Sequence, residues 1–538
     1  MKKSLLSCVL YLMSCVCFSQ ECHISEDGQS IVKQSDTIFR LSNFKDLKVK
    51  KIDSFTFDGE GSRIMFAVET ATDTWGGTSA EYYVYSIAGN WLDRVSEYGK
   101  QQSPAFSPNG RMVAFVRNNN LFIRKFDYGT EVAVTEDGGD SILNGLPDWN
   151  TKHYFPRTEY FAWSADGKML AFLRFDQSEV RDFCIDDVAD FDDTVFDADD
   201  FYPKKRCYKY STAGSAVAKV SLMVYDVQYR SVHQLDVSAE EEFYIPRFAW
   251  LTSGQLAVVT LNRSQNRLNV QVINPKSNVS KNILKEDFTL DTPLDMDNIS
   301  QMTFAENDFS YSGNVYSYMG ILKKHQKPAT DSLAKNNLIK PLDFDSCSVY
   351  PAVLLQDTSL LSFFIENNYI VLLEQKLPAM PDTTTAQTLI RAAHRLAALP
   401  YIDSTRIIIA GSGIGATSAL LAMSQGDNIF SAGIVINPIT DWRFYNALYA
   451  ERYLHRPQEN IDEYSLHSPL EQAKNLQGKV FIAHNTGNED IYVQNSFVYA
   501  RRLTLLGKPF EMQMYPNMPK EVVDRDLRVR ILNFLERK

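Results

Sequence analysis

The sequence has little positive charge and no concentration of it. Its 538 residues carry 55 Lys and Arg against 66 Asp and Glu, which gives a formal net charge of −11. No stretch is dense in Lys or Arg, so nucleic acid is not expected as a partner. After the first twenty residues no apolar run is long enough to cross a bilayer, and we predict no transmembrane span once a leader is removed.

Cysteine is also scarce. Three of the seven cysteines lie within the first 17 residues, and the spacing of the other four, Cys22, Cys184, Cys207 and Cys347, is not typical of a zinc site. In an oxidising compartment Cys184 and Cys207 could close a loop, and free buried thiols are the alternative. Residues 184–207 hold eight Asp without the spacing of a calcium-binding loop, so we predict a solvated acidic insertion. We expect no metal and no cofactor.

The N-terminus reads MKKSLLSCVLYLMSCVCFSQ, which is a basic start followed by a short apolar core. This pattern is typical of a secretory signal peptide with cleavage near Ser19–Gln20. We therefore predict a signal peptide over residues 1–20 and an exported protein, periplasmic or at the cell surface. A marginal lipobox ending at Cys15 leaves a lipid anchor open, and a buried N-terminal helix is the alternative.

Apolar residues are abundant, at 44% of the chain, and the length predicts two or more domains. In the first half one signature recurs, in which an aromatic residue precedes a polar turn with Gly and then alternating apolar residues. Its copies are FTFDGEGSRIMFAV from Phe55, PAFSPNGRMVAFVR from Pro104, FAWSADGKMLAFLR from Phe161 and a weaker FAWLTSGQLAVVTL from Phe248. Such a repeat predicts an all-β propeller over residues 35–340, with an irregular β-sandwich as the alternative.

The second half, residues 345–538, alternates strand-like and helix-like segments. Buried-strand runs such as VYPAVLL, RIIIAG and KVFIAHN are separated by helical patterns, and TTTAQTLIRAAHRLAAL predicts an amphipathic helix with a threonine N-cap. A last helix is predicted over Val522–Leu535. This alternation predicts an α/β domain with a doubly wound, mostly parallel sheet.

Residues 406–416, RIIIAGSGIGA, predict a strand, a tight turn and a helix. Their spacing is that of the nucleophile elbow Gly-x-Ser-x-Gly of α/β-hydrolases, but Gly413 stands where the serine would be. In that fold the catalytic histidine follows the acid along the chain, and no histidine follows His484. The weak dinucleotide pattern Gly-x-Gly-x-x-Ala is a less favoured interpretation, because no acidic ribose partner stands in the expected place.

Several longer stretches resemble one family. They are NGLPDW at 144–149, WSADGKMLAFLRFDQSEV at 163–180, ITDWRFYNALYAERYL at 439–454 and LGKPFEMQMYP at 506–516. On these the chain is identified as a member of the prolyl oligopeptidase family, similar to dipeptidyl peptidase IV. The resemblance implies a β-propeller followed by an α/β-hydrolase domain, serine-type release of N-terminal Xaa-Pro dipeptides, and a homodimer.

The chain departs from the family at every position of the Ser-Asp-His triad. The resemblance places Gly413 at the nucleophile, Asn488 at the acid and Lys520 at the base. Ser412 is adjacent to the missing serine, and a Ser412–Lys520 dyad is an alternative that would need a strongly lowered lysine pKa. Asp357 falls where the family has its oxyanion tyrosine, and an acid there would oppose the developing negative charge.

The resemblance also indicates where two substrate-binding subsites would lie in this sequence. Lys152, His153 and Tyr154 replace the glutamates that hold the substrate amine, and a cationic loop would repel an ammonium group.

Trp442, Tyr445 and Tyr449 stand where the family builds its proline-accepting pocket. They are interpreted either as a residual peptide pocket or as core aromatics, since losing them would leave cavities.

Blade-like sequence stops near residue 320 and the hydrolase begins near 350, so we expect an incomplete or reclosed propeller of about five or six blades. The sequence favours an exported pseudopeptidase that acts by binding a peptide or protein, or as a scaffold. The alternatives are an active serine-type dipeptidyl peptidase and a decaying gene copy without function.

Overall fold

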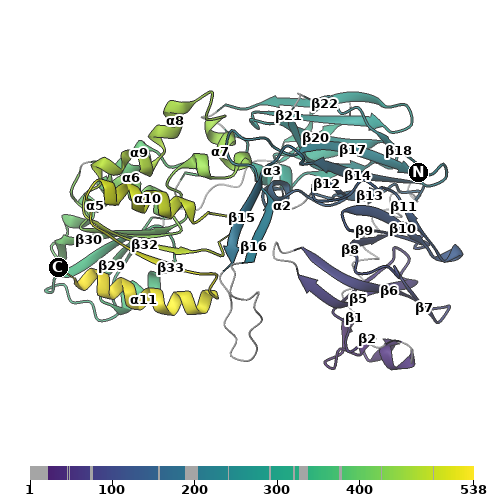
Figure 1. The fold of residues 1–538 in the computed structure, drawn as a ribbon, viewed down its shortest axis with the longest axis horizontal. Coiled ribbons are helices and arrows are strands. Elements are labelled where there is room, and N and C mark those ends of the chain that lie inside the picture. The colour runs from purple at the N-terminus through teal and green to yellow at the C-terminus, as the bar shows by residue number, and fades with distance from the viewer. Residues whose placement is uncertain are drawn as a thin grey trace.

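The computed structural model describes residues 22–44, 47, 49–72, 77–155, 158–187, 204–239, 242–289, 293–318, 322–325, 337–374, 378–425, 427–488 and 490–537. The predicted signal peptide and most of the acidic segment 184–207 lie outside these residues. The described chain forms a stack of antiparallel sheets followed by an α/β domain (Figure 1).

The first half folds into antiparallel sheets that follow one another along the chain. A three-stranded sheet comes first: β1 (Cys22–Ile24), β2 (Ser30–Lys33) and β3 (Asp36–Arg40). Two four-stranded sheets follow: β4 (Ser54–Phe57), β5 (Arg63–Thr72), β6 (Thr78–Ser86) and β7 (Trp91–Arg94), then β8 (Gln102–Phe106), β9 (Met112–Arg117), β10 (Asn120–Lys125) and β11 (Thr130–Ala133).

Three more sheets complete this half. A five-stranded sheet contains β12 (Ile142–Asn144), β13 (Phe161–Trp163), β14 (Met169–Asp176), β17 (Lys219–Asp226) and β18 (Ser231–Gln234). The next contains β19 (Phe243–Trp250), β20 (Leu256–Asn262), β21 (Arg267–Asn274) and β22 (Val279–Asp287). The last contains β23 (Thr303–Phe304), β24 (Asp308–Tyr311), β25 (Asn314–Ser317) and β26 (Leu322–His325). Short helices interrupt the sheets at α2 (Trp149–Tyr154) and α3 (Met296–Ser300).

The recurring sequence signature forms the same hairpin turn in four sheets. Its glycines, Gly61, Gly110, Gly167 and Gly254, have φ between 66° and 75°. This left-handed region is open to glycine at little cost. Each glycine N–H donates to the carbonyl three residues earlier, for example Gly110 to Ser107 at 2.8 Å. The repeat therefore encodes the turn of the hairpins β4–β5, β8–β9, β13–β14 and β19–β20, as the sequence predicted.

Buried clusters join neighbouring sheets in chain order. Met65 of one sheet packs with Phe115 of the next, and Leu170 packs with Val116. Within the described residues, none of these clusters joins β23–β26 to the first sheets, and Figure 1 shows β1–β7 and β19–β22 at opposite ends of the stack. The described residues thus contain five propeller sheets of four or five strands, in agreement with the expected five or six blades.

A disulfide-linked hairpin projects beside the five-stranded sheet. Strands β15 (Asp182–Asp187) and β16 (Lys204–Lys209) pair so that Cys184 lies opposite Cys207, and the two form a disulfide. The disulfide interpretation is confirmed. Figure 1 places this hairpin between the two halves of the molecule.

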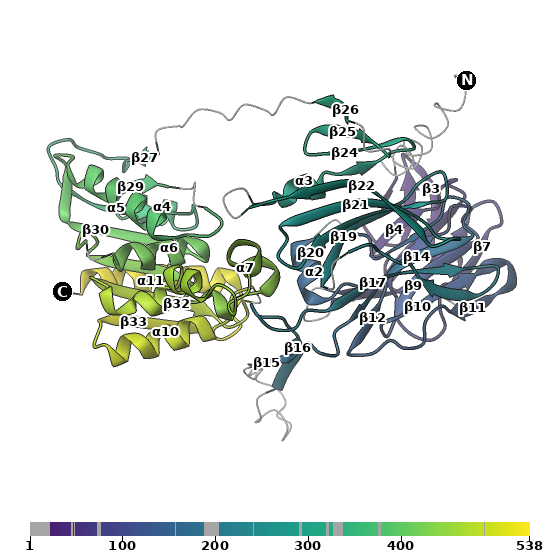
Figure 2. The same cartoon turned by 90° about the horizontal axis from the view of Figure 1, so that it is seen from above.

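The second half is a seven-stranded sheet in the order β27-β29-β28-β30-β31-β32-β33, parallel except for β27 (Figure 2). Its strands are β27 (Leu338–Ile339), β28 (Tyr350–Leu355), β29 (Ile370–Leu373), β30 (Ile402–Ser412), β31 (Ala432–Ile436), β32 (Lys479–Asn485) and β33 (Phe510–Tyr515). Its helices are α4 (Leu361–Glu366), α5 (Thr383–Ala397), α6 (Ile414–Met423), α7 (Ala447–Leu454), α8 (Ile461–Leu466), α9 (Pro469–Gln472), α10 (Gln494–Leu505) and α11 (Lys520–Glu536).

Helices cover both faces of this sheet. Ile407 and Ile409 of β30 point into a core with α5, α6 and α10, whereas Ile408 and Ala410 point into a core with α4 and α11. Alternate residues of a strand point to opposite faces, so a continuous apolar run is what a doubly covered strand requires. The predicted doubly wound α/β domain is confirmed.

Two details of the helices differ from the sequence prediction. The N-cap of α5 is Asp382, whose carboxylate accepts the N–H of Thr385 at 2.8 Å, and not one of the threonines. A carboxylate makes a stronger cap than a threonine hydroxyl, so the helix begins one residue after it. The last helix begins at Lys520, two residues earlier than predicted. None of the described helices is long and apolar enough to cross a membrane.

Candidate functional site

The strand-to-helix turn after β30 has the backbone of a nucleophile elbow. Gly413 alone joins β30 to α6, with φ 53° and ψ −118°. An L side chain is strained at this φ, and α/β-hydrolases hold their nucleophile in such a sharp turn. A Cβ on Gly411 would lie 2.7 Å from the carbonyl carbon of Gly415, so these glycines let the helix approach the strand. The turn is present, and its apex carries no side chain.

Ser412 faces a carboxylate beside this turn. Its N–H and its hydroxyl both donate to Oδ2 of Asp357, at 3.0 and 3.1 Å. Asp357 follows β28, and its other oxygen accepts the N–H of Ser359 at 2.9 Å. Lys520 lies exposed at the start of α11. The structure therefore pairs Ser412 with Asp357, and it does not assemble the Ser412–Lys520 dyad.

Asn488 is engaged within its own turn. Its Oδ1 accepts the N–H groups of Asp490 and Ile491, both at 3.0 Å. This is the local bonding by which Asn side chains stabilise turns. The side chain of Ile491 then lies over the elbow, because a Cβ on Gly413 would be 3.4 Å from its Cδ1.

His484, at the end of β32, is the histidine nearest to this turn in the sequence, and it is 1% exposed. The carbonyl of Ile491 can only accept, so Nε2–H donates to it at 2.9 Å and Nδ1 accepts from the hydroxyl of Ser496 at 2.8 Å. Burial lowers the pKa of His484 to about 4, against the opposing effect of the Ile491 carbonyl. A neutral imidazole with both nitrogens bonded holds the turn to α10.

Three aromatic rings pack next to the elbow. Trp442 stacks on Tyr449 with centroids 5.9 Å apart, and Tyr445 meets both rings edge-on at 5.6 and 5.5 Å. The Trp442 indole donates to the carbonyl of His467 at 3.1 Å, and the Tyr449 hydroxyl donates to that of Ala379 at 2.6 Å.

Side chains from the elbow itself and from the Asn488 turn pack against these three rings, which are called the aromatic pocket below because the resemblance places a proline-accepting pocket here. Ile414, the first residue of α6, and Ile491 belong to the same cluster as Trp442. Trp442 and Tyr445 are buried, and with Tyr449 they form an aromatic cluster that borders the apex of the elbow.

The segment 149–154 forms helix α2, where the sequence suggested a cationic loop. Asp148 caps this helix by accepting the N–H of Thr151 at 3.2 Å, which is why the segment is helical. His153 donates from Nδ1 to the carbonyl of Trp149 at 2.8 Å and stacks on its ring. Among the three predicted positions, Tyr154 forms a hydrogen bond to the aromatic pocket.

That bond joins the two halves of the molecule. The Tyr154 hydroxyl donates to the Tyr445 hydroxyl at 3.3 Å, and their neighbour Tyr449 lies 6.1 Å from the Tyr154 ring. Burial raises the pKa of Tyr445 to about 12, and that of Tyr154 well above its ordinary value. A pair of neutral phenols therefore links the aromatic cluster to the propeller.

Sequence analysis missed a second aromatic cluster at this junction. Phe183 of the disulfide hairpin lies 3.5 Å, centroid to centroid, from Tyr492 of the hydrolase domain. Tyr210 meets Tyr492 and Trp149 edge-on at 5.2 and 4.8 Å. The aromatic content of residues 208–210 and 492 was visible in the sequence, but nothing in it indicated that these rings meet.

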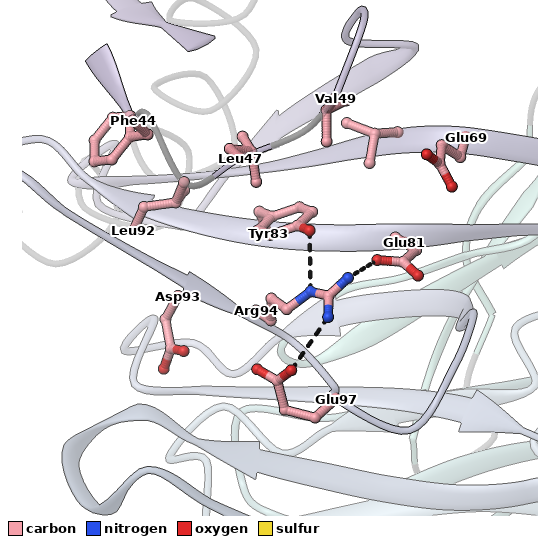
Figure 3. A pocket seen from close by; sticks show the side chains of 11 residues that line it. Phe44, Leu47, Val49, Glu69, Glu81, Tyr83, Leu92, Asp93, Arg94 and Glu97 are labelled. Atoms are coloured by element: carbon pink, nitrogen blue, oxygen red, sulfur yellow. Dashed lines mark hydrogen bonds and ion pairs between the residues drawn. The ribbon is translucent and has the colours of Figure 1, made fainter. Parts of the chain in front are cut away.

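A different concavity lies in the propeller between β5, β6 and β7. It is a cavity of about 580 Å³ with an apolar wall that includes Phe44, Leu47 and Leu92 (Figure 3). Arg94 occupies its floor and donates to the Tyr83 hydroxyl at 3.0 Å and to Glu97 at 3.2 Å, and it also pairs with Glu81. Its guanidinium is thus engaged on three sides, which makes this a structural charge cluster.

Within the part of the chain that the structure describes, no group of three or more His, Cys, Asp or Glu side chains is placed to hold a metal ion.

Comparison with known proteins gives two family matches. Residues 59–316 match the dipeptidyl peptidase IV N-terminal region, and residues 374–533 match the prolyl oligopeptidase family. Similar proteins include probable dipeptidyl-aminopeptidase B of Paracoccidioides lutzii, 21% identical over 79% of this chain and 66% of that protein. The protein of the same name from Aspergillus oryzae is 22% identical over 82% of this chain and 68% of its own length.

The chain thus spans about two-thirds of the length of these relatives. The alignment with the Paracoccidioides lutzii protein extends over 601 positions, more than the 538 residues here, so the relative carries residues without counterpart in this chain.

Two solved structures share the fold. The crystal structure of Porphyromonas gingivalis dipeptidyl peptidase 4 superposes with a TM-score of 0.85 at 25% identity, over 96% of this chain and 95% of that one. A putative dipeptidyl aminopeptidase IV from Bacteroides ovatus gives a TM-score of 0.67 at 14% identity, over 96% of each chain. The chain belongs to the prolyl oligopeptidase family, among the proteins that resemble dipeptidyl peptidase IV.

Proposed function

We propose that this chain is a pseudopeptidase, which binds a peptide or a protein segment at the aromatic pocket and does not cleave it. The observation that carries the proposal is Gly413 at the apex of the elbow. Covalent hydrolysis needs a nucleophile there and a base within hydrogen-bond reach. Gly413 supplies neither hydroxyl nor thiol, and the hydroxyl next to it, on Ser412, is bonded to Asp357.

The remaining positions support the same proposal. Asn488 is bonded within its turn, and Lys520 is exposed at a helix start. Asp357 places a carboxylate beside the elbow, where transition-state stabilisation of acyl transfer requires hydrogen-bond donors. By contrast, Trp442, Tyr445 and Tyr449 form a packed aromatic cluster after β31, at the carboxyl ends of the parallel strands, where α/β folds bind ligands.

Export is part of the proposal. A basic start and an apolar core at the N-terminus favour a signal peptide. The Cys184–Cys207 disulfide joins two exposed residues, which supports an oxidising compartment such as the periplasm or cell surface. A lipid anchor and a homodimer remain predictions.

The test measures cleavage and binding with two ligands that share the Ala-Pro sequence. Purified protein is incubated with an Ala-Pro reporter amide to measure hydrolysis, and with a fluorescein-labelled Ala-Pro peptide to measure binding. We expect no hydrolysis above buffer, no labelling by a fluorophosphonate probe, and saturable binding that Tyr449→Ala weakens. Tyr229→Ala, at a site that is 76% exposed, is the matched control and should bind as the wild type does.

An active dipeptidyl peptidase is the second candidate, favoured by the names of the relatives. Heat-sensitive fluorophosphonate labelling together with reporter hydrolysis that Ser412→Ala abolishes would establish it and overturn the proposal. Absence of both cleavage and binding would leave the pocket aromatics as core residues, and would equally contradict a peptide-binding role.

A further inference from the structure

Helix α7, which carries Tyr449 and follows Tyr445, belongs to both halves of the molecule. Its Leu448 is buried in the core cluster of the propeller with Tyr244 and Leu261. Its Leu454 is buried with Trp442 in the cluster of the hydrolase domain. Figure 2 shows α7 beside α2, at the junction of the two halves. The helix that presents the aromatic pocket is therefore packed against the propeller along one side.

The backbone at the start of α7 is bonded to the propeller. The N–H of Ala213 donates to the carbonyl of Tyr445 at 3.1 Å, and the N–H of Ala447 donates to that of Ser211 at 2.9 Å. These two bonds form an isolated antiparallel bridge between Thr212 and Asn446. The backbone is thus held on both sides of Asn446, the residue after Tyr445, by a propeller segment.

A buried ion pair joins the middle of α7 to the propeller. Arg263, in the turn after β20, donates from Nε and Nη2 to the two carboxylate oxygens of Glu451, each at 2.7 Å. Their side chains are 7% and 1% exposed. Glu451 also accepts the N–H of Gly214 at 2.7 Å, and Arg263 donates to Glu242 at 2.9 Å and to the carbonyl of Ser215 at 2.6 Å. Every polar atom of the carboxylate is used.

Gln265, two residues after Arg263, makes a second set of hydrogen bonds to α7. Its side-chain amide donates to the carbonyl of Leu448, and its Oε1 accepts from Nε of Arg452 at 2.7 Å. Gln265 is 1% exposed and Arg452 is 7% exposed. The same propeller turn therefore bonds to α7 at two places one helical turn apart.

We propose that Arg263 and Gln265 are positioning residues for the aromatic pocket, so that the propeller sets where Tyr445 and Tyr449 stand. The planar guanidinium meets the carboxylate as a two-bond fork, which fixes orientation as well as distance. A helix held at Leu448, Glu451 and Arg452 cannot rotate without breaking these bonds. Because Tyr449 lies between these residues, its ring position depends on them.

This inference rests on the proposed function where it concerns ligand affinity, so its test has a second readout that needs no ligand. The chain is labelled with 5-fluorotryptophan, and the resonance of Trp442 is identified by its loss in Trp442→Phe. The ring of Tyr449 stacks on Trp442 at 5.9 Å, so movement of Tyr449 changes the ring current at Trp442 and shifts this resonance.

The variants are Arg263→Met, the uncharged double variant Arg263→Met/Glu451→Leu, and the control Arg267→Met. Arg267 lies close to Arg263 in the sequence and pairs with the exposed Asp287 at 2.7 Å. We expect both Arg263 variants to shift or broaden the Trp442 resonance and to weaken Ala-Pro peptide binding about tenfold. Arg267→Met should change neither. The double variant removes both members of the Arg263–Glu451 pair, so neither is left without the other, and it stays informative if Arg263→Met fails to fold.

The outcomes separate the two proposals. A Trp442 resonance unchanged in the folded double variant would overturn the positioning role, whatever the ligand. An altered resonance in a protein whose wild type binds no Ala-Pro peptide would support the positioning role and contradict the peptide-binding function. Arg263→Lys adds a graded test, because it keeps the charge without the fork and should fall between wild type and Arg263→Met.

Discussion

The elbow and helix α7 form two sides of one site, and they are built differently. At the elbow the backbone turn is complete, but Gly413 has no side chain and Lys520 is exposed. On α7 the side chains are buried and bonded, with Glu451 at 1% exposure and both of its carboxylate oxygens engaged. The elbow therefore keeps its backbone shape without a nucleophile at the apex, whereas α7 keeps a dense set of side-chain contacts.

This difference shows that different interactions hold the two sides in place. The elbow depends on glycine packing between a strand and a helix, which any α/β-hydrolase sheet requires regardless of chemistry. Helix α7 depends on long-range polar contacts with another domain. Such contacts fix one arrangement of the two domains, and a binding surface shared by both domains needs that arrangement.

The largest effect on stability is expected when the Glu451 carboxylate of α7 is removed. Glu451→Ala leaves the Arg263 guanidinium buried without its partner, and we expect the free energy of unfolding to fall by about 3–5 kcal/mol in urea titrations. Asp287→Ala, at an exposed pair, should change it by less than about 1 kcal/mol. A Glu451→Ala protein as stable as Asp287→Ala would show that α7 is not held as described.

The second test uses pH at the turn that borders the elbow. The pKa of His484 is lowered to about 4 in the folded protein from an ordinary 6.5, so the unfolded chain binds the extra proton first as pH falls. The stabilisation is complete above pH 6.5 and is lost progressively down to about pH 4, by about 3 kcal/mol. His484→Gln should remove this part of the acid destabilisation. Parallel stability profiles for wild type and variant between pH 7 and pH 4 would contradict the role given to the imidazole.

The third test adds a side chain to the elbow. Gly413→Ala should cost about 1–2 kcal/mol in thermal or urea unfolding, because an L residue at φ 53° is strained. The added Cβ meets only an ordinary contact, 3.4 Å from Ile491, so crowding adds little. Gly139→Ala is the control, since its φ is not left-handed and nothing lies within 4 Å of its Cβ. An equal effect at both glycines would mean that the elbow turn is not strained.

The smallest effect is expected at Lys520. Because this residue is exposed at the first position of α11, Lys520→Met should change the free energy of unfolding by less than about 0.5 kcal/mol. Binding of the Ala-Pro peptide should also be unchanged. A marked loss of either binding or reporter hydrolysis in Lys520→Met would assign this lysine a function and sharpen the case for an active enzyme.

Local patterns in the sequence predicted much of this architecture. The turn glycines, such as Gly61 and Gly110, are set by the backbone of one hairpin, so a short motif contains all the information that determines them. The same holds for the elbow around Gly413. The cap of α5 was misplaced by one residue because Asp382 and Thr383 are both good N-cap residues, and only the geometry decides between them.

The contacts between domains could not be predicted in this way. Arg263 and Glu451 are 188 residues apart, and Glu451 lies in a stretch already quoted for its resemblance to the family. Nothing in the sequence around either residue indicates which charge meets which. The helix at 149–154 was missed for a related reason, because six residues are too few for a periodic pattern and its cap, Asp148, is a common turn residue.

The most direct measurement of the central claim is product analysis at high protein concentration. Equimolar protein and an Ala-Pro-extended peptide are held together for a day, and the mixture is analysed by mass spectrometry and fluorescence anisotropy. The account predicts an intact peptide that remains bound. Stoichiometric release of the Ala-Pro dipeptide, abolished by Ser412→Ala, would contradict it.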